Sequence, residues 1–547
     1  MELSDEIERV ISCLHYTLTS LSETKFEEEP TDLLPTIQVL STIKLRVMEL
    51  SQCSNRSEMN PVTCQRLISC LLYNLEKFGE LVELWGTKFR NKDKDSLSTY
   101  KAKFETISEF VEVAPFLDKN DLFCLGRSEE RWLKLRENCE YVSCPKPQKV
   151  RRKYESFVMQ VAAGQAVVSV AHSETKNYKK RIIMGLGAIY YNLFRKKAKR
   201  KAEASYARAQ IEVAQSLWNL VDSWILTNFM KILIPKINTN KVIYLPRTAP
   251  HLLDNSSPKN TETSFKSTKT EDSVMVRLLS TSALEVDQSS LLKCCLPVKD
   301  NQHDQLIFHI HGGGFISMSS ASHQVYTRRW VNNLGIPLLS VDYRLAPAHP
   351  FPEPLDDIWQ AYYWAINNAD QLGITPKKVV VVGDSAGGNL ALALTYKAIQ
   401  AGVKVPDGIV VAYPALNLSK NNFTDSLLLT LDDLLLPHTL LKLCLKSYIQ
   451  DPALDPSTNP LLSPLVIEDH MLEKFPPVRM LVGSADPLHD DCWRFLERLV
   501  NCGVDAKMKV YEAAMHACLN LCFKGGIKES QVPVDQMGDW ISELLSN

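Results

Sequence analysis

The feature that most constrains the fold is a short strand–turn–helix pattern in the middle of the chain. Residues 379–382 are four consecutive valines, and they lead directly into Gly-Asp-Ser-Ala-Gly-Gly-Asn at 383–389. A helix-forming run, Leu-Ala-Leu-Ala-Leu at 390–394, follows this turn. A G-x-S-x-G turn between a strand and a helix presents the serine hydroxyl at the end of a sheet. We therefore predict Ser385 as a nucleophile, and the alternative is an ordinary strand-to-helix turn.

A glycine loop upstream is suited to hold the negative oxygen that forms when a serine attacks a carbonyl. The apolar strand 306–308 runs into His-Ile-His-Gly-Gly-Gly-Phe, in which the consecutive glycines leave their N–H groups uncovered. We predict that the oxyanion donors come from this loop and from the residue after the serine: Gly312, Gly313, Gly314 and Ala386. The alternative is a flexible glycine loop without a role in binding. We interpret His311 as a residue that shapes the loop.

The predicted acid and base follow later strands of the same sheet. Residues 478–482 form an apolar strand pattern, after which Asp486 lies at a carboxyl strand end, where open α/β sheets place functional groups. The last strand pattern, 506–511, is followed closely by His516. We predict Asp486 as the acid and His516 as the general base. Three rivals fall on the helix after Asp486 and are better explained as helix-capping or solvated side chains: His489, Asp490 and Asp491.

The predicted nucleophile, acid and base (Ser385, Asp486 and His516) indicate a serine-dependent attack on a carboxylic ester. His516 would take the proton of Ser385 as the hydroxyl attacks, and Asp486 would fix the imidazole tautomer and stabilise its charge. An acyl-serine would form, and water activated by the same histidine would release the acid. This chemistry needs no metal and no organic cofactor. The cysteine spacing agrees, because it contains no C-x-x-C zinc or redox pattern.

Together these motifs resemble the hormone-sensitive lipase group of α/β-hydrolases. A further shared motif is Asp-Tyr-Arg-Leu-Ala-Pro at 342–347, and the segments 402–409, 433–437 and 459–464 resemble hormone-sensitive lipases within that group. The resemblance is strong from about residue 274 onward and loose before it. It implies an α/β-hydrolase fold and an intracellular serine lipase or esterase acting on acylglycerols, chiefly diacylglycerol, with cholesteryl esters as further candidates.

Two alternative functions remain open. One is a carboxylesterase or deacetylase of small soluble esters, which would use the same three residues. The other is a non-catalytic ligand-binding member of the fold, as in the gibberellin receptors, which have lost the histidine. A difference in regulation is also expected. Only ten residues separate Tyr448 from Asn459, where mammalian hormone-sensitive lipases carry a long regulatory insertion.

The chain divides into two regions of different pattern. Its 547 residues are too many for one ordinary core. Residues 1–250 show apolar side chains at helical spacing, which predicts an all-α N-terminal domain. Residues 251–273, rich in Ser, Thr, Asn and Lys, predict a linker or surface loop. Residues 274–547 alternate strand and helix patterns, which predicts a mostly parallel sheet covered on both faces. The resemblance implies a docking or dimerisation role for the N-terminal domain.

The charge balance and the N-terminus predict where the protein acts. A net charge of −1 gives no general attraction for nucleic acid. The acidic N-terminus has no secretory apolar region, and the scattered cysteines favour reduced thiols. We expect a cytoplasmic protein with reversible lipid-droplet association. Its candidate partners are a lipid ester at a lipid–water interface, a lipid-droplet surface or droplet-coat protein, and a second copy of the chain.

One apolar segment of the N-terminal region has strongly basic flanks. Residues 182–194 are mostly apolar, and they lie between Lys-Lys-Arg at 179–181 and a basic run at 195–201. Thirteen residues are too few to span a bilayer as a helix. Two interpretations stay open. The segment is either an interfacial helix on an anionic lipid surface or a buried core helix with solvated basic ends.

Overall fold

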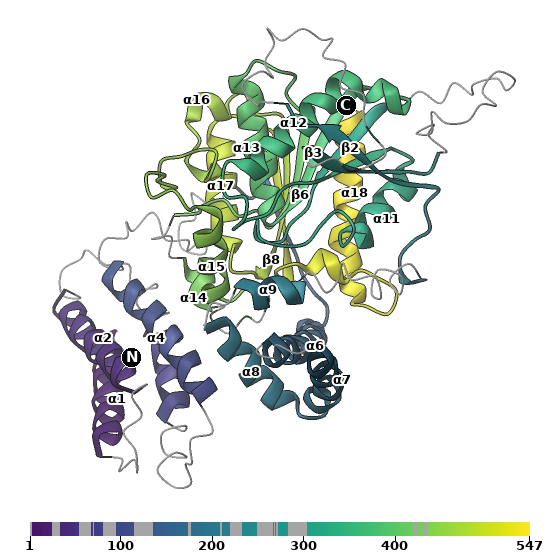
Figure 1. Ribbon diagram of the computed structural model, residues 1–547. Coiled ribbons are helices and arrows are strands. Elements are labelled where there is room, and N and C mark those ends of the chain that lie inside the picture. The colour runs from purple at the N-terminus through teal and green to yellow at the C-terminus, as the bar shows by residue number, and fades with distance from the viewer. Residues whose placement is uncertain are drawn as a thin grey trace, which may run out of the picture. The chain divides into compact units, whose positions relative to one another are not determined.

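The chain forms two compact units, defined here as the helical unit and the sheet unit (Figure 1). The helical unit comprises Met1–Trp132, Glu155–Leu217 and Asn421–Leu443, and the sheet unit comprises Leu133–Tyr154, Trp218–Lys420 and Cys444–Asn547. The structure is a computed structural model that describes the following residues: 3–23, 33–53, 67–68, 70–79, 94–113, 135–172, 177–207, 211–218, 232–248, 266, 269, 272–282, 303–419, 424–429, 431, 433 and 435–546.

The sheet unit is built on a nine-stranded sheet with the strand order β1-β9-β8-β7-β6-β4-β5-β3-β2. Strand β3 pairs antiparallel with β2 and with β5, and all other neighbours are parallel. The strands are β1 Cys139–Val142, β2 Thr239–Pro246, β3 Ser273–Ser280, β4 His303–Ile310, β5 Leu338–Asp342, β6 Ile374–Asp384, β7 Gly408–Ala412, β8 Val478–Ala485 and β9 Ala506–Met515.

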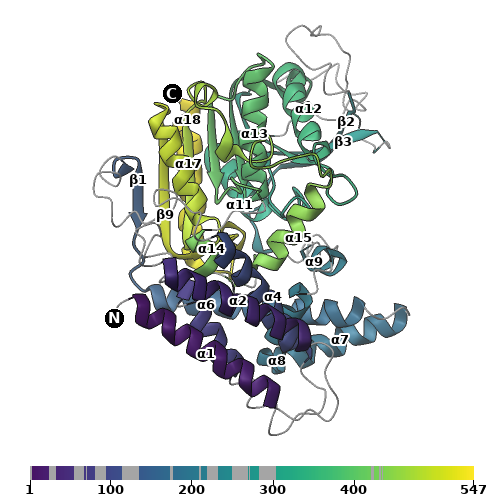
Figure 2. The same cartoon turned by 90° about the vertical axis from the view of Figure 1, so that its left-hand side faces the viewer.

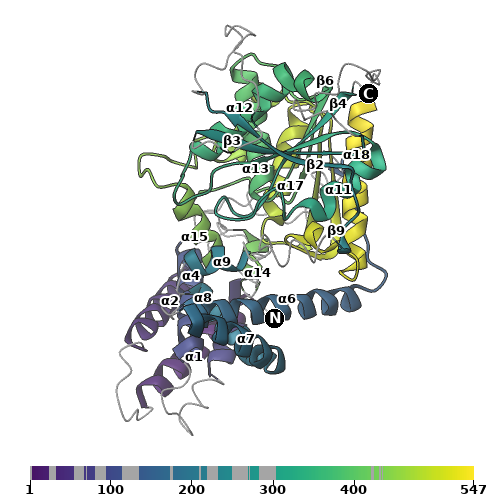
Figure 3. The same ribbon diagram turned by 45° about the vertical axis from the view of Figure 1, so that its right-hand side comes forward.

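Helices cover both faces of this sheet. Helices α12, α13 and α17 lie over one face, which is turned toward the viewer in Figure 2, and α11 and α18 lie over the other (Figure 3). The valines of β6 are fully buried, as expected for a strand covered on both sides. This arrangement confirms the predicted mostly parallel sheet. The helices are α11 Gln324–Leu334, α12 Glu353–Asn368, α13 Ala386–Gln400, α15 His438–Tyr448, α16 Asp469–Leu472, α17 His489–Asn501 and α18 Gln531–Ser546.

Two strands of the sheet come from the region that the sequence predicts to be all helical. Strand β1 pairs with β9 at one edge, and β2 pairs with β3 at the other. The boundary predicted at residue 250 therefore differs from the structure, because short edge strands take their stability from distant partners. Most of the predicted linker 251–273 lies outside the described residues, although Lys266 forms a backbone bridge with Tyr244 of β2.

The helical unit buries its own apolar core. Phe78 and Phe104 meet edge to face at 5.5 Å in this core, and Leu427 and Leu428 of α14 pack into it from a segment far along the chain. The segment 421–443 therefore belongs to the helical unit, although the sequence analysis places it in the catalytic domain. The helices are α1 Leu3–Glu23, α2 Leu33–Cys53, α4 Lys94–Val113, α6 Pro147–His172, α7 Asn177–Leu193, α8 Arg195–Ala207, α9 Ile211–Trp218 and α14 Asp425–Leu429.

Candidate active site

Ser385 lies in a sharp turn between β6 and α13. Its φ of 54° and ψ of −121° are unusual for a residue with a side chain, and this strained turn points the hydroxyl out of the backbone. The turn requires glycine nearby, because a Cβ on Gly387 would lie 2.2 Å from the carbonyl oxygen of Ile310. The Ser385 N–H donates to the carbonyl of Ala412 at 2.9 Å, which fixes the turn to β7.

The structure brings Ser385, His516 and Asp486 together in one hydrogen-bonded chain. Ser385 Oγ lies 3.0 Å from His516 Nε2, and His516 Nδ1 lies 3.0 Å and 3.1 Å from the two carboxylate oxygens of Asp486. The pairing of β8 with β9 explains why Asp486 and His516 are in contact. Ala485 pairs with Met515 at the ends of these strands, and Asp486 and His516 are the residues that follow. The N–H of Leu488 donates to Asp486 Oδ1 at 2.9 Å and holds the buried carboxylate in place.

The three rivals occupy the first turn of α17, as the sequence analysis places them. His489 Nδ1 lies 2.9 Å from Asp490, and its Nε2 accepts a hydrogen bond from the indole of Trp493 at 3.1 Å. Asp491 forms an ion pair with Arg494 one turn later in the same helix. These contacts bind the rival side chains to their own helix, so the geometry favours Asp486 as the partner of the imidazole.

Three of the four predicted oxyanion donors have backbone N–H groups available. Within the part of the chain that the structure describes, the N–H groups of Gly313 and Gly314 have no hydrogen-bond partner. Ala386 is the first residue of α13, so its N–H is one of those that a helix leaves unpaired at its start. These three groups stay predicted donors for an oxyanion.

The structure corrects the prediction for the fourth donor, Gly312. Its N–H lies 3.0 Å from Asp384 Oδ1 and 3.2 Å from His323 Nε2, so it already serves a buried acceptor. An N–H engaged in this way does not point at a substrate. The sequence analysis could not see this, because the accepting carboxylate of Asp384 comes from β6, far along the chain.

A buried polar network beneath the glycine loop was missed by the sequence analysis. The hydroxyl of Tyr326 donates to Asp384 Oδ1 at 2.8 Å, and His309 Nε2 lies 3.1 Å from the same hydroxyl. Burial alone would raise the pKa of Asp384, but the charge of the facing His323 and the hydrogen bonds lower it to about 2. The available signal was an acid directly before the nucleophile at a strand end. His323 and Tyr326 gave no such signal.

His311 lies against the side of this loop. Its ring stacks on Tyr343 with centroids 4.2 Å apart and an angle of 10°, and the Tyr343 hydroxyl donates to the carbonyl of His311 at 2.9 Å. Burial lowers the pKa of His311 to about 3, so its ring stays neutral at physiological pH. This geometry agrees with the interpretation of His311 as a residue that shapes the loop.

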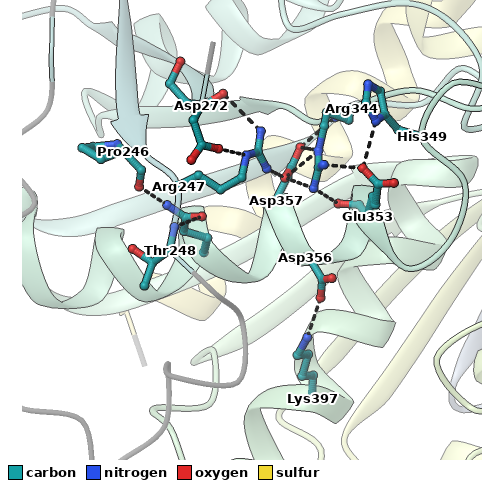
Figure 4. Close-up of polar contacts among 12 residues, drawn as sticks. Pro246, Arg247, Thr248, Asp272, Arg344, His349, Glu353, Asp356, Asp357 and Lys397 are labelled. Carbon is teal, nitrogen blue, oxygen red and sulfur yellow. Dashed lines mark hydrogen bonds and ion pairs between the residues drawn. The ribbon is translucent and has the colours of Figure 1, made fainter. Parts of the chain in front are cut away.

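A second network, shown in Figure 4, anchors the loop that carries Tyr343. The buried carboxylate of Asp357 on α12 accepts hydrogen bonds from the guanidinium groups of Arg247 and Arg344 and, at 3.0 Å, from the backbone N–H of Arg344. The same loop continues to Ala346, whose N–H donates to the carbonyl of Phe315 at 2.9 Å. The loop after β5 therefore connects α12 to the glycine loop, which gives residues 353–357 a structural role.

Replacing Asp384 by asparagine is expected to lower the free energy of unfolding by about 2 kcal/mol at neutral pH, because charge-assisted hydrogen bonds are lost. The pKa of about 2 lies below the ordinary 3.8, so the ionised carboxylate adds stability above pH about 4 that is lost as the pH falls toward 2. Urea unfolding of both proteins at neutral and acidic pH measures this difference, which should shrink on acidification. A difference that stays constant with pH would contradict the assignment.

The matched control is Asp304→Asn. This carboxylate is exposed and lies 3.7 Å from the exposed Lys377. Surface ion pairs of this kind contribute between about 0 and 1 kcal/mol, so the substitution should change the unfolding free energy little at either pH.

Comparison with known proteins finds matches to part of this chain. The family described as alpha/beta hydrolase fold matches residues 307–520. The chain is 35% identical to the mouse (Mus musculus) hormone-sensitive lipase over 248 residues, which cover 43% of this chain and 32% of that protein. It is also 36% identical over 208 residues to an esterase of Acinetobacter venetianus, covering 38% of this chain and 65% of the esterase.

A solved structure shows the same fold. The hyperthermophilic esterase of Pyrobaculum calidifontis matches with a TM-score of 0.50 and 23% sequence identity, covering 63% of this chain and 97% of that one. The chain spans only about a third of the length of the mouse lipase, so similarity to that protein describes the matched segment alone. The sheet topology, the strained serine turn and these matches together identify the C-terminal part of the chain as an α/β-hydrolase domain, similar in sequence to hormone-sensitive lipases and microbial esterases.

Proposed function

We propose that this protein is a serine ester hydrolase that acts on lipid esters, chiefly diacylglycerol and other acylglycerols, with cholesteryl esters as further substrates. The observation that supports hydrolysis is the hydrogen-bonded chain from Ser385 through His516 to the buried Asp486, with contacts of 3.0–3.1 Å. This arrangement has the geometry and order of a nucleophile, a general base and an orienting acid.

The proposed reaction passes through an acyl-serine. His516 Nε2 accepts the proton of Ser385 while Oγ bonds to the ester carbonyl carbon, and the carbonyl oxygen becomes an oxyanion. The oxyanion is stabilised by the N–H groups of Gly313, Gly314 and Ala386. The protonated imidazole then gives its proton to the departing alcohol. Water, deprotonated by the same nitrogen, releases the carboxylic acid and restores the serine.

The similarity to hormone-sensitive lipases supports lipid esters as substrates. The main alternative is a carboxylesterase or deacetylase of small soluble esters, which the similarity to the Acinetobacter esterase supports by the same argument. The second alternative is a non-catalytic ligand-binding protein. That function would be expected if the contacts among Ser385, His516 and Asp486 were missing. Instead, His516 lies within hydrogen-bond distance of both of its partners.

A chain-length series separates the two catalytic functions. The full-length protein would be assayed on p-nitrophenyl esters from acetate to palmitate and on emulsified dioleoylglycerol, with Ser385→Ala as the blank. We expect hydrolysis of the emulsion at a rate well above that blank, with long acyl chains preferred. Activity on short soluble esters alone would establish the small-ester function instead. Full-length protein is needed, since removal of residues 1–250 would also remove β1 and β2 from the sheet.

A further inference from the structure

Helix α7 in the helical unit has apolar side chains on two of its faces. One face packs on α6, where Gly187 lies against Val167 and a Cβ at that glycine would be in ordinary contact at 3.5 Å. Tyr191, one turn later, packs on a cluster of small buried side chains from α6 and α8, which lie beside α7 (Figure 3): Ala163, Ala166 and Ala198. This face packs α7 against its neighbours within the unit.

The other face of α7 is apolar and exposed. Leu186, Ile189 and Leu193 are 65%, 62% and 73% exposed, and their spacing places them on one side of the helix. Neighbouring side chains extend this surface, and we define the α7 stripe as Leu186, Ile189, Tyr190, Leu193 and Phe194. The interpretation of this segment as a buried core helix therefore does not hold for this face. A contiguous exposed apolar surface of this kind marks a site of interaction.

The stretch of sequence that carries the α7 stripe has charged residues of one sign. Residues 177–202 contain no aspartate or glutamate, and their basic residues are Lys179, Lys180, Arg181, Arg195, Lys196, Lys197, Lys199, Arg200 and Lys201. Lys197 reaches back to the stripe: its Nζ lies 3.0 Å from the Tyr190 hydroxyl and 5.2 Å from the centre of the Phe194 ring. A lysine that extends over aromatic rings keeps its charge at the edge of an apolar surface, which suits a lipid–water boundary.

We propose that the α7 stripe and its basic flanks dock the protein on an anionic lipid surface. The helix would lie in the plane of the surface, with the stripe among the acyl chains and the lysines and arginines at the headgroups. Among the described segments, no helix is long and apolar enough to cross a bilayer. The inference is independent of the proposed ester hydrolysis.

Other occupants fit this surface less well. A second copy of the chain would bring two basic regions against each other, and like charges at an interface oppose association. A nucleic acid would neutralise the lysines but would leave the apolar side chains in water. Only a lipid surface supplies negative headgroups and an apolar phase within the width of one helix.

Vesicle cosedimentation of the full-length protein tests the proposal. Vesicles of phosphatidylcholine with phosphatidylserine should bind the protein, and vesicles of phosphatidylcholine alone should bind it much less. The triple variant Leu186→Gln, Ile189→Gln, Leu193→Gln should lose binding by about 100-fold or more, since three apolar side chains no longer enter the membrane. The matched control replaces three other exposed apolar residues, which are 63%, 77% and 52% exposed: Leu45→Gln, Ile232→Gln and Val532→Gln.

A charge variant tests the second half of the proposal. Arg195→Gln, Lys196→Gln and Lys197→Gln together should weaken binding to the anionic vesicles by about 100-fold, because each basic residue near such a surface adds about fivefold. Arg195→Lys, Lys196→Arg and Lys197→Arg preserve the charge and should bind like the wild type. Hydrolysis of a soluble short-chain ester should be unchanged in every variant, which separates this result from the proposed function.

Three outcomes would overturn the proposal. The first is a wild-type protein that binds neither kind of vesicle. The second is an equal loss in the stripe variant and its matched control, which would show a general effect of removing exposed apolar side chains. The third is a stripe variant that changes from dimer to monomer by light scattering while vesicle binding stays intact, which would assign the stripe to contact between copies.

Discussion

Replacing Ser385 by alanine is expected to lower kcat/KM on a short p-nitrophenyl ester by about 10⁶-fold, to a rate set by the remaining donors and binding contacts. The reason is that His516 Nε2, 3.0 Å from the hydroxyl, then has no nucleophile to deprotonate. Steady-state hydrolysis measures the loss. Ser457→Ala is the matched control, because this exposed serine bonds within its own turn to Asp455 and should leave the rate unchanged.

The double variant shows whether the two side chains act as one unit. His516→Ala alone should cost about as much as Ser385→Ala, and the two together should cost little more than either, since each loss already removes the same step. The thermal unfolding midpoint of each variant, measured alongside, shows whether the fold is kept. Losses that multiply in the double variant would mean that the two residues contribute separately, and activity that survives Ser385→Ala would assign the chemistry elsewhere.

The central elements of the site could be predicted because they are local in sequence. The strand, the turn and the helix around Ser385 are consecutive, so the valine run and the glycines specify both the element types and the exposure of the serine. Asp486 and His516 could be placed because each directly follows a buried strand. The sheet then brings them together, since β8 and β9 are adjacent and parallel.

The remaining features depend on contacts between distant segments. The loss of Gly312 as a donor follows from Asp384, which lies 72 positions later and accepts its N–H. Edge strand β1 has four residues and joins the sheet only through β9, so its own sequence carries little signal. The exposure of the α7 stripe could not be predicted from the sequence either. Apolar residues recur at the same spacing on a helix face that packs on protein and on one that does not.

Asp486→Asn is expected to lower kcat by about 10⁴-fold while the fold is kept. The side-chain oxygen of asparagine can still accept the N–H of Leu488, which donates to Oδ1 at 2.9 Å in the wild type. Its amide group then faces His516 Nδ1, which must become an acceptor. The proton of the neutral ring moves to Nε2, the nitrogen that faces Ser385 Oγ, and that nitrogen can no longer accept the serine proton.

The control for this substitution is Asp490→Asn, four positions later. Asp490 is also buried, but its carboxylate lies 2.9 Å from His489 on the same helix, so its loss should leave kcat close to the wild-type value. Steady-state kinetics with both variants, together with urea unfolding, distinguishes a change of tautomer from a loss of structure. A large loss in Asp490→Asn with wild-type activity in Asp486→Asn would reverse the assignment of the acid. Equal losses of kcat and of stability in both would show that this turn is needed for folding and leave no specific part for Asp486 in the proton transfer.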